Sequence, residues 1–524
     1  MRRRLGIGIA VLGGLAAVIG ALAAANSSQP GHSRHATLPA PPTAPVLAGV
    51  KGPTLGVAAG PGHQIRRGFL GFSLEFQAVR AYTGNNPRVI NPVLLQLIRN
   101  LSPNQTPTLR IGGDSTDVSW VPTPGVKPPP YVSYRLTPSW LATTAALAHD
   151  LGAQMTMGLN LAANQPALAA AEARAYLKTI GGGFIAALEI GNEPNVYGKI
   201  QVLHTLLGAP LYARPRGYGY PQFLREFRAE AAASPRLALS GPALAVGPRP
   251  DRGSWIQTMP GFLRGEPRVA AMTVHRYPLR NCYVPPSSPQ YPTVANLLSG
   301  YSTSGLVASL RRWIGIAHAH RRAIRVDELN SVACRGKAGV SDTFAASLWV
   351  TDALFSLVRA GVDGINVHTL PNSAYELFQF SHHGGRWHAR VKPVYYGLQL
   401  FAQAAPVGAR LIGLDGLHRA PGFSAWATRT PDGTVRVVLI NKSQRVGRTV
   451  TLRSPGAVRS ATIERMQAPS VHSSDVTLGG RSYGASTSTG RLAPPALESV
   501  RRRGRSYPVS VPRGSAALIT FAPR

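Results

Sequence analysis

Acidic residues and cysteines are scarce in this chain of 524 residues. It has 22 Asp and Glu against 56 Lys and Arg, a formal net charge of +34 at pH 7, and only two cysteines. Two cysteines form at most one disulfide and are too few to build a structural zinc site by themselves, since such a site takes four ligands. Because 44% of the residues are hydrophobic and 15% are charged, intrinsic disorder is excluded and a large core is expected.

The positive charge is scattered along the chain. Nearly all of it is arginine, and the basic runs are short, as at residues 501–503. Coding bias or an acidic habitat explains such a distribution, and a basic cleft for an acidic surface or a polyanionic substrate is the alternative. The sequence has no nucleic-acid-binding motif and no interleaving of aromatic and basic residues, which argues against nucleic acid as a partner.

A long apolar stretch occurs only near the N-terminus. Residues 1–25 have the pattern of a signal peptide, with basic residues 2–4 and the small residues Ala23 and Ala25 before a cleavage site. About 20 apolar residues also suffice to span a bilayer, so an uncleaved anchor is the alternative. Both interpretations place the body of the protein outside the cytoplasm, and residues 26–50 are expected to be a Pro/Ser-rich linker.

Residues 69–405 alternate short apolar runs with helical patterns. We predict eight strand–helix units, with strands at residues 69–76, 108–111, 154–159, 184–190, 237–240, 269–274, 323–326 and 364–367. Such alternation implies parallel strands, and eight units can close into a (β/α)8 TIM barrel with its active site at the carboxyl ends of the strands. An open doubly wound sheet is the alternative, but the sequence lacks the glycine-rich nucleotide loops that such sheets carry.

The helical patterns end near residue 406. Residues 423–428 and 435–440 flank a Pro-Asp-Gly turn and predict a β-hairpin, and three more apolar runs follow as strands. We therefore expect a C-terminal all-β sandwich over residues 406–524. A strand within residues 51–68 is expected to join this domain.

Two glutamates follow the fourth and seventh predicted strands. Glu193 lies in Ile-Gly-Asn-Glu-Pro-Asn, and Glu328 lies in Val-Asp-Glu-Leu-Asn. The fourth and seventh strands of an eightfold barrel face each other across its mouth, and two facing carboxylates are what glycoside hydrolysis needs, one protonated and one ionised. Pro194 restrains the residue before it, which helps to hold Glu193 in place. Two unrelated surface acids would explain poorly why both lie at strand ends in apolar contexts.

These motifs resemble a known family. Asn-Glu-Pro after the fourth strand and a Glu after the seventh are similar to the retaining glycosidases of the large (β/α)8 clan. Five segments in order resemble glycoside hydrolase family 79, which contains β-glucuronidases and heparanase-like enzymes. They are Gly71-Phe-Ser-Leu-Glu75, Arg110-Ile-Gly-Gly-Asp114, Ile190-Gly-Asn-Glu-Pro-Asn195, Val274-His-Arg-Tyr277 and Lys392-Pro-Val-Tyr-Tyr-Gly397.

The resemblance implies roles for the residues around the paired glutamates. Glu193 would be the acid/base and Glu328 the nucleophile. Asn192 would contact the 2-hydroxyl group of the sugar, and Tyr277 would donate a hydrogen bond to the nucleophile. These roles describe a retaining mechanism with no cofactor and no metal.

The resemblance also implies a set of substrate-binding residues. Glu75 and Asp114 would bind hydroxyl groups of the terminal sugar. Ala374 and Tyr375 would form a clamp in which a backbone N–H and the tyrosine hydroxyl hold the uronate carboxylate. Because Ala374 stands where the family pattern has glycine, a neutral sugar is the alternative substrate.

Neighbouring residues carry further expectations. Side chains alternate along a strand, so Asp327 should point away from the side that Glu328 faces. Glu189 is expected to pair with an arginine across the barrel, such as Arg110. Cys282 and Cys334 follow adjacent strands, so a disulfide between them is expected to brace the loop after Glu328, with two free thiols as the alternative.

The function that follows is a secreted retaining β-glycosidase, an exo-acting β-glucuronidase that works by double displacement on a carbohydrate. A neutral-sugar enzyme of galactosidase or xylosidase type and an endo-β-glucuronidase acting on a uronate polysaccharide are alternatives with the same chemistry. A non-catalytic carbohydrate-binding envelope protein is the alternative from another class. No membrane contact is expected beyond the possible N-terminal anchor.

Overall fold

The structure, a computed structural model, describes residues 50–58, 60–201, 203–205, 208–249, 255–416, 420–453 and 456–524. The predicted signal peptide (residues 1–25) and the predicted linker up to residue 49 lie outside this range. Among the described residues, no helix has the length and apolar character needed to cross a membrane.

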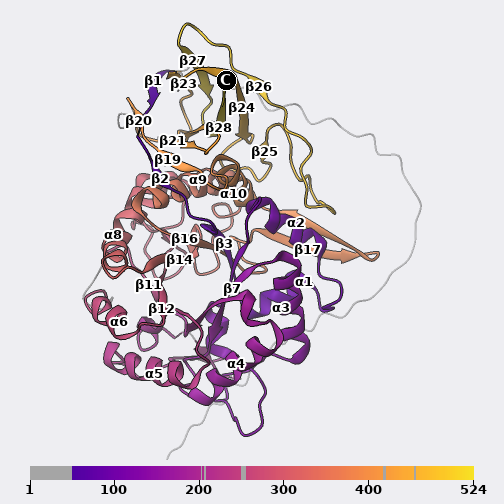
Figure 1. The fold of residues 1–524 in the computed structure, drawn as a ribbon, viewed down its shortest axis with the longest axis vertical. Coiled ribbons are helices and arrows are strands. Elements are labelled where there is room, and N and C mark those ends of the chain that lie inside the picture. Colours follow the sequence, from indigo (N-terminus) through magenta and orange to yellow (C-terminus); the bar gives the residue numbers. More distant parts are fainter. Residues whose placement is uncertain are drawn as a thin grey trace, which may run out of the picture. The chain divides into compact units, whose positions relative to one another are not determined.

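Eight parallel strands close into a barrel in chain order (Figure 1). They are β3 (Leu70–Leu74), β4 (Thr108–Ile111), β7 (Gln154–Leu159), β8 (Ile185–Ile190), β11 (Leu239–Ala245), β12 (Val269–His275), β14 (Ala323–Leu329) and β16 (Gly364–Thr369). The last strand pairs with the first, from Ile365 beside Leu70 to Thr369 beside Leu74. The predicted (β/α)8 barrel is confirmed.

Helices follow the strands and cover the outside of the barrel (Figure 1). They are α1 (Phe76–Thr83), α2 (Pro92–Leu101), α3 (Pro138–Leu151), α4 (Pro166–Thr179), α5 (Tyr220–Ala233), α6 (Met259–Gly265), α7 (Val294–Leu298), α8 (Ser304–Ala319), α9 (Phe344–Ala360) and α10 (Pro393–Ala404). Several begin with proline in the first turn, where its missing N–H costs nothing. The Asn91 side chain caps α2, and the Thr137 side chain caps α3.

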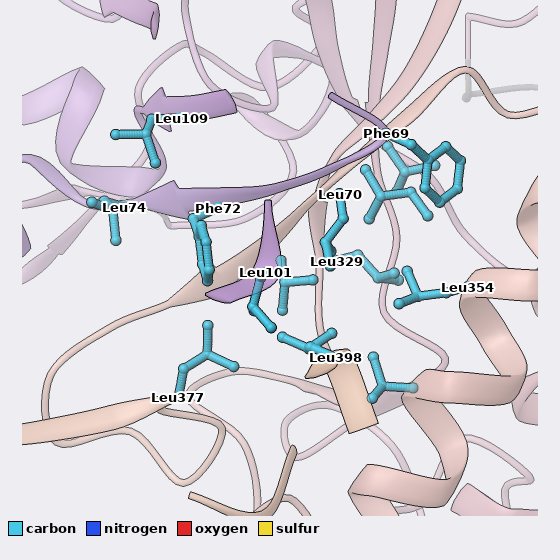
Figure 2. Packing of buried hydrophobic residues seen from close by; sticks show 14 of the residues in the cluster. Phe69, Leu70, Phe72, Leu74, Leu101, Leu109, Leu329, Leu354, Leu377 and Leu398 are labelled. Atoms are coloured by element: carbon cyan, nitrogen blue, oxygen red, sulfur yellow. The ribbon is translucent and has the colours of Figure 1, made fainter. Parts of the chain in front are cut away.

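Apolar side chains fill the space between the barrel and its helices. Figure 2 shows Phe72 and Leu70 of β3 near Leu398 of α10 and Leu354 of α9. These side chains are almost completely buried. Each such side chain contributes about 1.5–3 kcal/mol through burial, which makes the barrel a rigid support for the residues at its rim.

Residues after the barrel, together with two strands from the segment before it, form two β-sheets. One contains β2 (His63–Gln64), β19 (Arg410–Ile412), β21 (Phe423–Arg429), β22 (Val435–Asn441), β28 (Ser515–Pro523), β24 (Val458–Gln467), β25 (Thr477–Leu478) and β26 (Glu498–Ser499). The other contains β20 (Leu414–Asp415), β1 (Val50–Val57), β23 (Arg448–Arg453) and β27 (Ser506–Val511). Buried side chains from both sheets form one hydrophobic cluster. The predicted all-β domain is confirmed.

The segment before the barrel joins this domain. The indigo strand β1 lies among orange and yellow strands in Figure 1, parallel to β23 and antiparallel to β20. The barrel and the β-domain are also joined by a buried carboxylate. Asp352 of α9 accepts hydrogen bonds from Ser424, Trp426 and Lys442 of the β-domain at 2.6–2.9 Å.

Candidate active site

Glu193 lies in a left-handed turn directly after β8. Its φ is 50° and its ψ is 47°, a conformation that costs a residue other than glycine about 1–3 kcal/mol. Its N–H donates to the Ala243 carbonyl at 2.9 Å, and Pro194 opens a short 3-10 helix, Pro194–Val196. These contacts hold Glu193 at the barrel rim with its side chain 24% exposed.

Glu328 lies inside β14, one residue before the strand ends, and not beyond the strand as the sequence suggested. The Tyr277 hydroxyl donates to its Oε1 at 2.8 Å, and Arg110 Nη1 donates to its Oε2 at 2.8 Å. Burial alone would raise the pKa of Glu328. The nearby imidazoles of His368 and His275 and the Arg110 guanidinium outweigh burial and hold that pKa well below its usual range. The carboxyl of Glu328 is therefore ionised.

His275 lies between the two glutamates. Its Nδ1 is 3.0 Å from Glu193 Oε1 and 3.6 Å from Glu328 Oε2. One oxygen of each carboxylate and one nitrogen of this imidazole all lie within 4.8 Å of one another. Retaining glycosidases have carboxyl groups about 5–5.5 Å apart and inverting ones about 6.5–9.5 Å apart, so this spacing fits retention.

Asp327 also points into the barrel, so the expectation that it points away from Glu328 is wrong. The pairing of β12 with β14 shifts between Val274–Val326 and His275–Glu328, which leaves Asp327 as an extra residue in a bulge. Its Oδ1 is 3.5 Å from His275 Nε2. Burial and then the neighbouring Glu189 raise the pKa of Asp327 well above its usual range, which favours the neutral acid.

Arg110 of β4 links the residues beneath the site. Its Nε donates to Glu189 at 2.6 Å, as the sequence suggested, and its Nη2 donates to Asn192 Oδ1 at 3.0 Å. The Asn192 amide nitrogen donates to Asp114 Oδ1 at 3.1 Å. Both ends of the Asn192 amide are thus occupied, and its orientation is set before any sugar enters.

Glu75 braces the loop that carries Asp114. Its carboxylate accepts the backbone N–H of Asp114 at 3.2 Å and of Ser115 at 2.8 Å, and it also accepts the Ser115 hydroxyl. Gly113 has φ 90°, and a Cβ there would lie 2.4 Å from Glu75 Oε1, so only glycine fits. Loss of water around the carboxyl, followed by the carboxylates of Glu75 and Glu193, raises the pKa of Asp114, although the residue as a whole is exposed at the cleft.

The residues proposed for the uronate clamp differ in position. Tyr375 is buried at the cleft, and its ring centroid is 6.1 Å from that of Tyr277. Ala374 does not line the cleft, and its N–H donates to the Arg335 carbonyl at 2.8 Å. An N–H with that partner has no hydrogen left for a carboxylate, so the Ala374 half of the predicted clamp is not available here.

The disulfide between Cys282 and Cys334 is confirmed, with the two Cα atoms 6.1 Å apart. It joins the loops after two short parallel strands, β13 (Leu279–Arg280) and β15 (Val332–Ala333). The crosslink therefore fixes the loop after Glu328, as expected.

These side chains surround a cleft of about 540 Å³, a volume in the range of small-ligand sites. Of the predicted site residues, the cleft is lined by Glu75, Asp114, Glu193, Tyr277, Glu328, Tyr375 and the disulfide partners Cys282 and Cys334, and His275 lines it as well. Asn192 is buried and does not line it. The arrangement can protonate a bridging oxygen and offer a second carboxylate to the same carbon.

His368 of β16 is a site residue that the sequence analysis missed. Its Nδ1 is 3.9 Å from Glu328 Oε2, and its Nε2 is 3.6 Å from Glu75 Oε1. Burial would lower the pKa of His368, but the carboxylates of Glu328 and Glu75 raise it. A histidine near the end of a completely buried strand was the available signal, because an ionisable group there needs a partner.

Within the part of the chain that the structure describes, two groups of three side chains have spacings that a metal ion would accept. Glu193, His275 and Glu328 form one, and Glu189, His275 and Asp327 form the other. In both, the Arg110 guanidinium already contacts a carboxylate, at 2.8 Å in the first and 2.6 Å in the second. A cation there would face a fixed positive charge, so we assign neither group to a metal.

Comparison with known protein families matches the C-terminal β-domain. Residues 425–518 match the model of the glycosyl hydrolase family 79 C-terminal beta domain. The chain is a glycoside hydrolase with the family 79 C-terminal domain. Among curated proteins, none matches this glycoside hydrolase in sequence.

Solved structures share the fold of this glycoside hydrolase. A 4-O-α-L-rhamnosyl-β-D-glucuronidase from Fusarium oxysporum 12S is 20% identical, with a TM-score of 0.69, and covers 89% of this chain and 100% of its own. A GH51 arabinofuranosidase from Xanthomonas axonopodis pv. citri is 14% identical, with a TM-score of 0.61 over 90% of this chain and 100% of its own. A xyloglucanase of family 44 from Paenibacillus polymyxa is 11% identical, with a TM-score of 0.56 over 90% of this chain and 99% of its own. At these identities the likeness concerns the fold alone.

Proposed function

We propose that this glycoside hydrolase is a retaining exo-β-glucuronidase that removes terminal β-D-glucuronic acid by double displacement. The observation that carries the proposal is the meeting of Glu193 and Glu328 within 4.8 Å across the barrel mouth. The two glutamates have different surroundings, which suit them to different roles. Glu328 is held as an anion by Tyr277 and Arg110, while Glu193 has more access to solvent.

In the first step Glu328 attacks the anomeric carbon as the bond to the leaving oxygen breaks. Glu193 gives its proton to that oxygen, so the leaving group departs as a neutral alcohol. The electron pair of the broken bond stays with the leaving oxygen, and a covalent glycosyl–Glu328 ester remains. Tyr277 stabilises Glu328 while it is an anion, which keeps it ready to attack and able to leave again.

In the second step water attacks the anomeric carbon from the side that the leaving group vacated. Glu193, now a carboxylate, takes a proton from this water, and Glu328 leaves as a carboxylate. Asp114 is exposed at the cleft, where its carboxyl is placed to form a hydrogen bond with a sugar hydroxyl. Glu75 holds the Asp114 loop and lines the same cleft.

Two observations other than the paired glutamates support glucuronic acid as the substrate and secretion of the protein. The Fusarium oxysporum structure that shares the fold is named for a glucuronide substrate. The Cys282–Cys334 disulfide is typical of an oxidising compartment outside the cytoplasm. A neutral-sugar β-glycosidase is the second candidate, because the Ala374 N–H is occupied by the Arg335 carbonyl.

A panel of aryl glycosides tests the proposal. The purified enzyme is assayed with nitrophenyl β-glucuronide, β-glucoside, β-galactoside and β-xyloside, and Glu328→Gln is assayed beside it. We expect the wild type to hydrolyse the β-glucuronide. Glu328→Gln should lose this activity but unfold at the same midpoint as the wild type. If the enzyme prefers a neutral glycoside, the proposed substrate is wrong and a neutral sugar takes its place. Full activity of Glu328→Gln would overturn the assignment of the nucleophile.

A further inference from the structure

Arg335 is held in a fixed position beside the loop that carries Tyr375. Cys334 and Arg335 have φ values of 62° and 65°, a strained left-handed pair, and the disulfide anchors the first of them. The Arg335 carbonyl accepts the Ala374 N–H at 2.8 Å, and its Nη2 donates to the Pro371 carbonyl at 3.3 Å. Both the backbone and the guanidinium of Arg335 thus lie against residues 371–375.

The next residue tightens this contact. Gly336 has φ 79°, and a Cβ there would lie 2.7 Å from the Tyr375 backbone nitrogen. The chain after Cys334 therefore packs directly on the chain at Ala374 and Tyr375. The positive charge of Arg335 is close enough to Tyr375 to act against the rise in the pKa of its hydroxyl, which burial and Glu328 cause.

The acidic residues of the cleft create a need for a positive charge that Arg335 can supply. Glu75, Asp114, Glu193 and Glu328 all line the cleft, so a sugar carrying a carboxylate enters beside four acids and needs a cation near its own charge. Arg110 is already engaged by Glu189 and Glu328.

Arg276 is also committed elsewhere. It is buried, and its guanidinium donates to the Ser309 hydroxyl and to the Tyr277 carbonyl. Arg335 is exposed and lines the cleft near Tyr375, and because its guanidinium donates one hydrogen bond, to the Pro371 carbonyl, its other N–H groups can serve a ligand.

We propose that Arg335 and the Tyr375 hydroxyl together bind the carboxylate of the substrate's uronic acid, in place of the main-chain N–H that Ala374 does not offer. A planar guanidinium donates two parallel hydrogen bonds to a carboxylate, which makes arginine a suitable replacement for that N–H. This inference rests on the proposed glucuronidase function and names its specificity-determining residue. The disulfide at Cys334 then acts as a brace for substrate selection as well as for Glu328.

The test compares two substrates that differ only at the carboxylate. We measure kcat/KM for an aryl β-glucuronide and an aryl β-glucoside with the wild type, Arg335→Gln, Arg335→Lys and the control Arg453→Gln. Arg453 is an exposed arginine of β23 in the β-domain and does not line the cleft. Thermal unfolding of each variant checks that the fold is intact.

Arg335→Gln is expected to lower kcat/KM for the glucuronide about 10- to 100-fold, the range for a lost hydrogen bond to a charged group, and to leave the glucoside unchanged. Arg335→Lys keeps the charge and should retain part of the preference, and Arg453→Gln should keep all of it. An equal loss on both substrates, or an unchanged ratio, overturns the role of Arg335 while the glucuronidase proposal stands. A wild type inactive on the glucuronide overturns both together.

Discussion

Two pairs of carboxylates lie on opposite sides of one imidazole, and they differ mainly in their access to water. The outer pair, Glu193 and Glu328, faces His275 Nδ1 with side chains 24% and 12% exposed. The inner pair, Glu189 and Asp327, faces the barrel interior with side chains 0% and 3% exposed. Arg110 contacts a member of both pairs. Under the proposed function, similar groups would act as reactants where a substrate can enter and as internal supports where it cannot.

The outer pair should carry the activity. Glu328→Gln removes the attacking oxygen anion while keeping the shape of the side chain, so we expect kcat/KM for an aryl β-glucuronide to fall on the order of 10⁴-fold. Steady-state kinetics measure the loss, and urea unfolding serves as the control, because the side chain is partly exposed and the fold should persist. A variant that keeps a tenth of the activity would remove Glu328 from the reaction.

The inner pair should carry stability. Glu189→Gln takes the anion away from Arg110 in a place that water does not reach, and breaking such a buried pair costs about 3–5 kcal/mol in the free energy of unfolding. Urea unfolding at pH 7 measures the change beside Glu328→Gln. If both variants unfold at the wild-type midpoint, the inner pair does not stabilise the fold more than the outer pair does, which contradicts the proposed difference.

Tyr277 offers a smaller test on the outer pair. Tyr277→Phe deletes the 2.8 Å hydrogen bond to ionised Glu328, and the loss of such a bond corresponds to about 10- to 100-fold in kcat/KM. The pKa of Glu328 should rise, so the acidic limb of the pH–rate profile should move to higher pH. An unmoved limb would mean that Tyr277 does not act on the nucleophile.

Asp327 offers the smallest test, on the inner pair. Its raised pKa means that the folded protein holds a proton that the unfolded chain releases near pH 4, so this residue lowers stability as pH rises above about 4 toward the folded-state pKa. Asp327→Asn, which is always neutral, should flatten that part of the stability curve. Unfolding free energies across pH 4–8 measure it. A curve identical to the wild type would show that Asp327 ionises normally.

Much of this architecture was predictable because it follows from local pattern. The eight barrel strands lie where apolar runs predicted them, and the positions of Glu193 and Glu328 follow from barrel geometry once the strands are counted. Strand β27 was missed because it contains Pro508, which argues against a strand interior. It is tolerated because β27 lies at the edge of its sheet.

The rest depended on contacts that no local pattern encodes. The predicted direction of the Asp327 side chain was wrong because a bulge in the pairing of β12 with β14 breaks the simple alternation of side chains along the strand. The Ala374 N–H found its partner in the Arg335 carbonyl, 39 positions earlier in the chain. Helix α1 is short and lacks a side-chain cap, so its sequence carries little signal of its own.

The stereochemistry of hydrolysis tests the central claim most directly. Proton NMR of the first turnovers on an aryl β-glucuronide identifies which anomer of glucuronic acid is released before mutarotation. Carboxylates within 4.8 Å of each other predict that the β-anomer appears first. Initial release of the α-anomer would mean direct attack by water and would contradict the role given to Glu328.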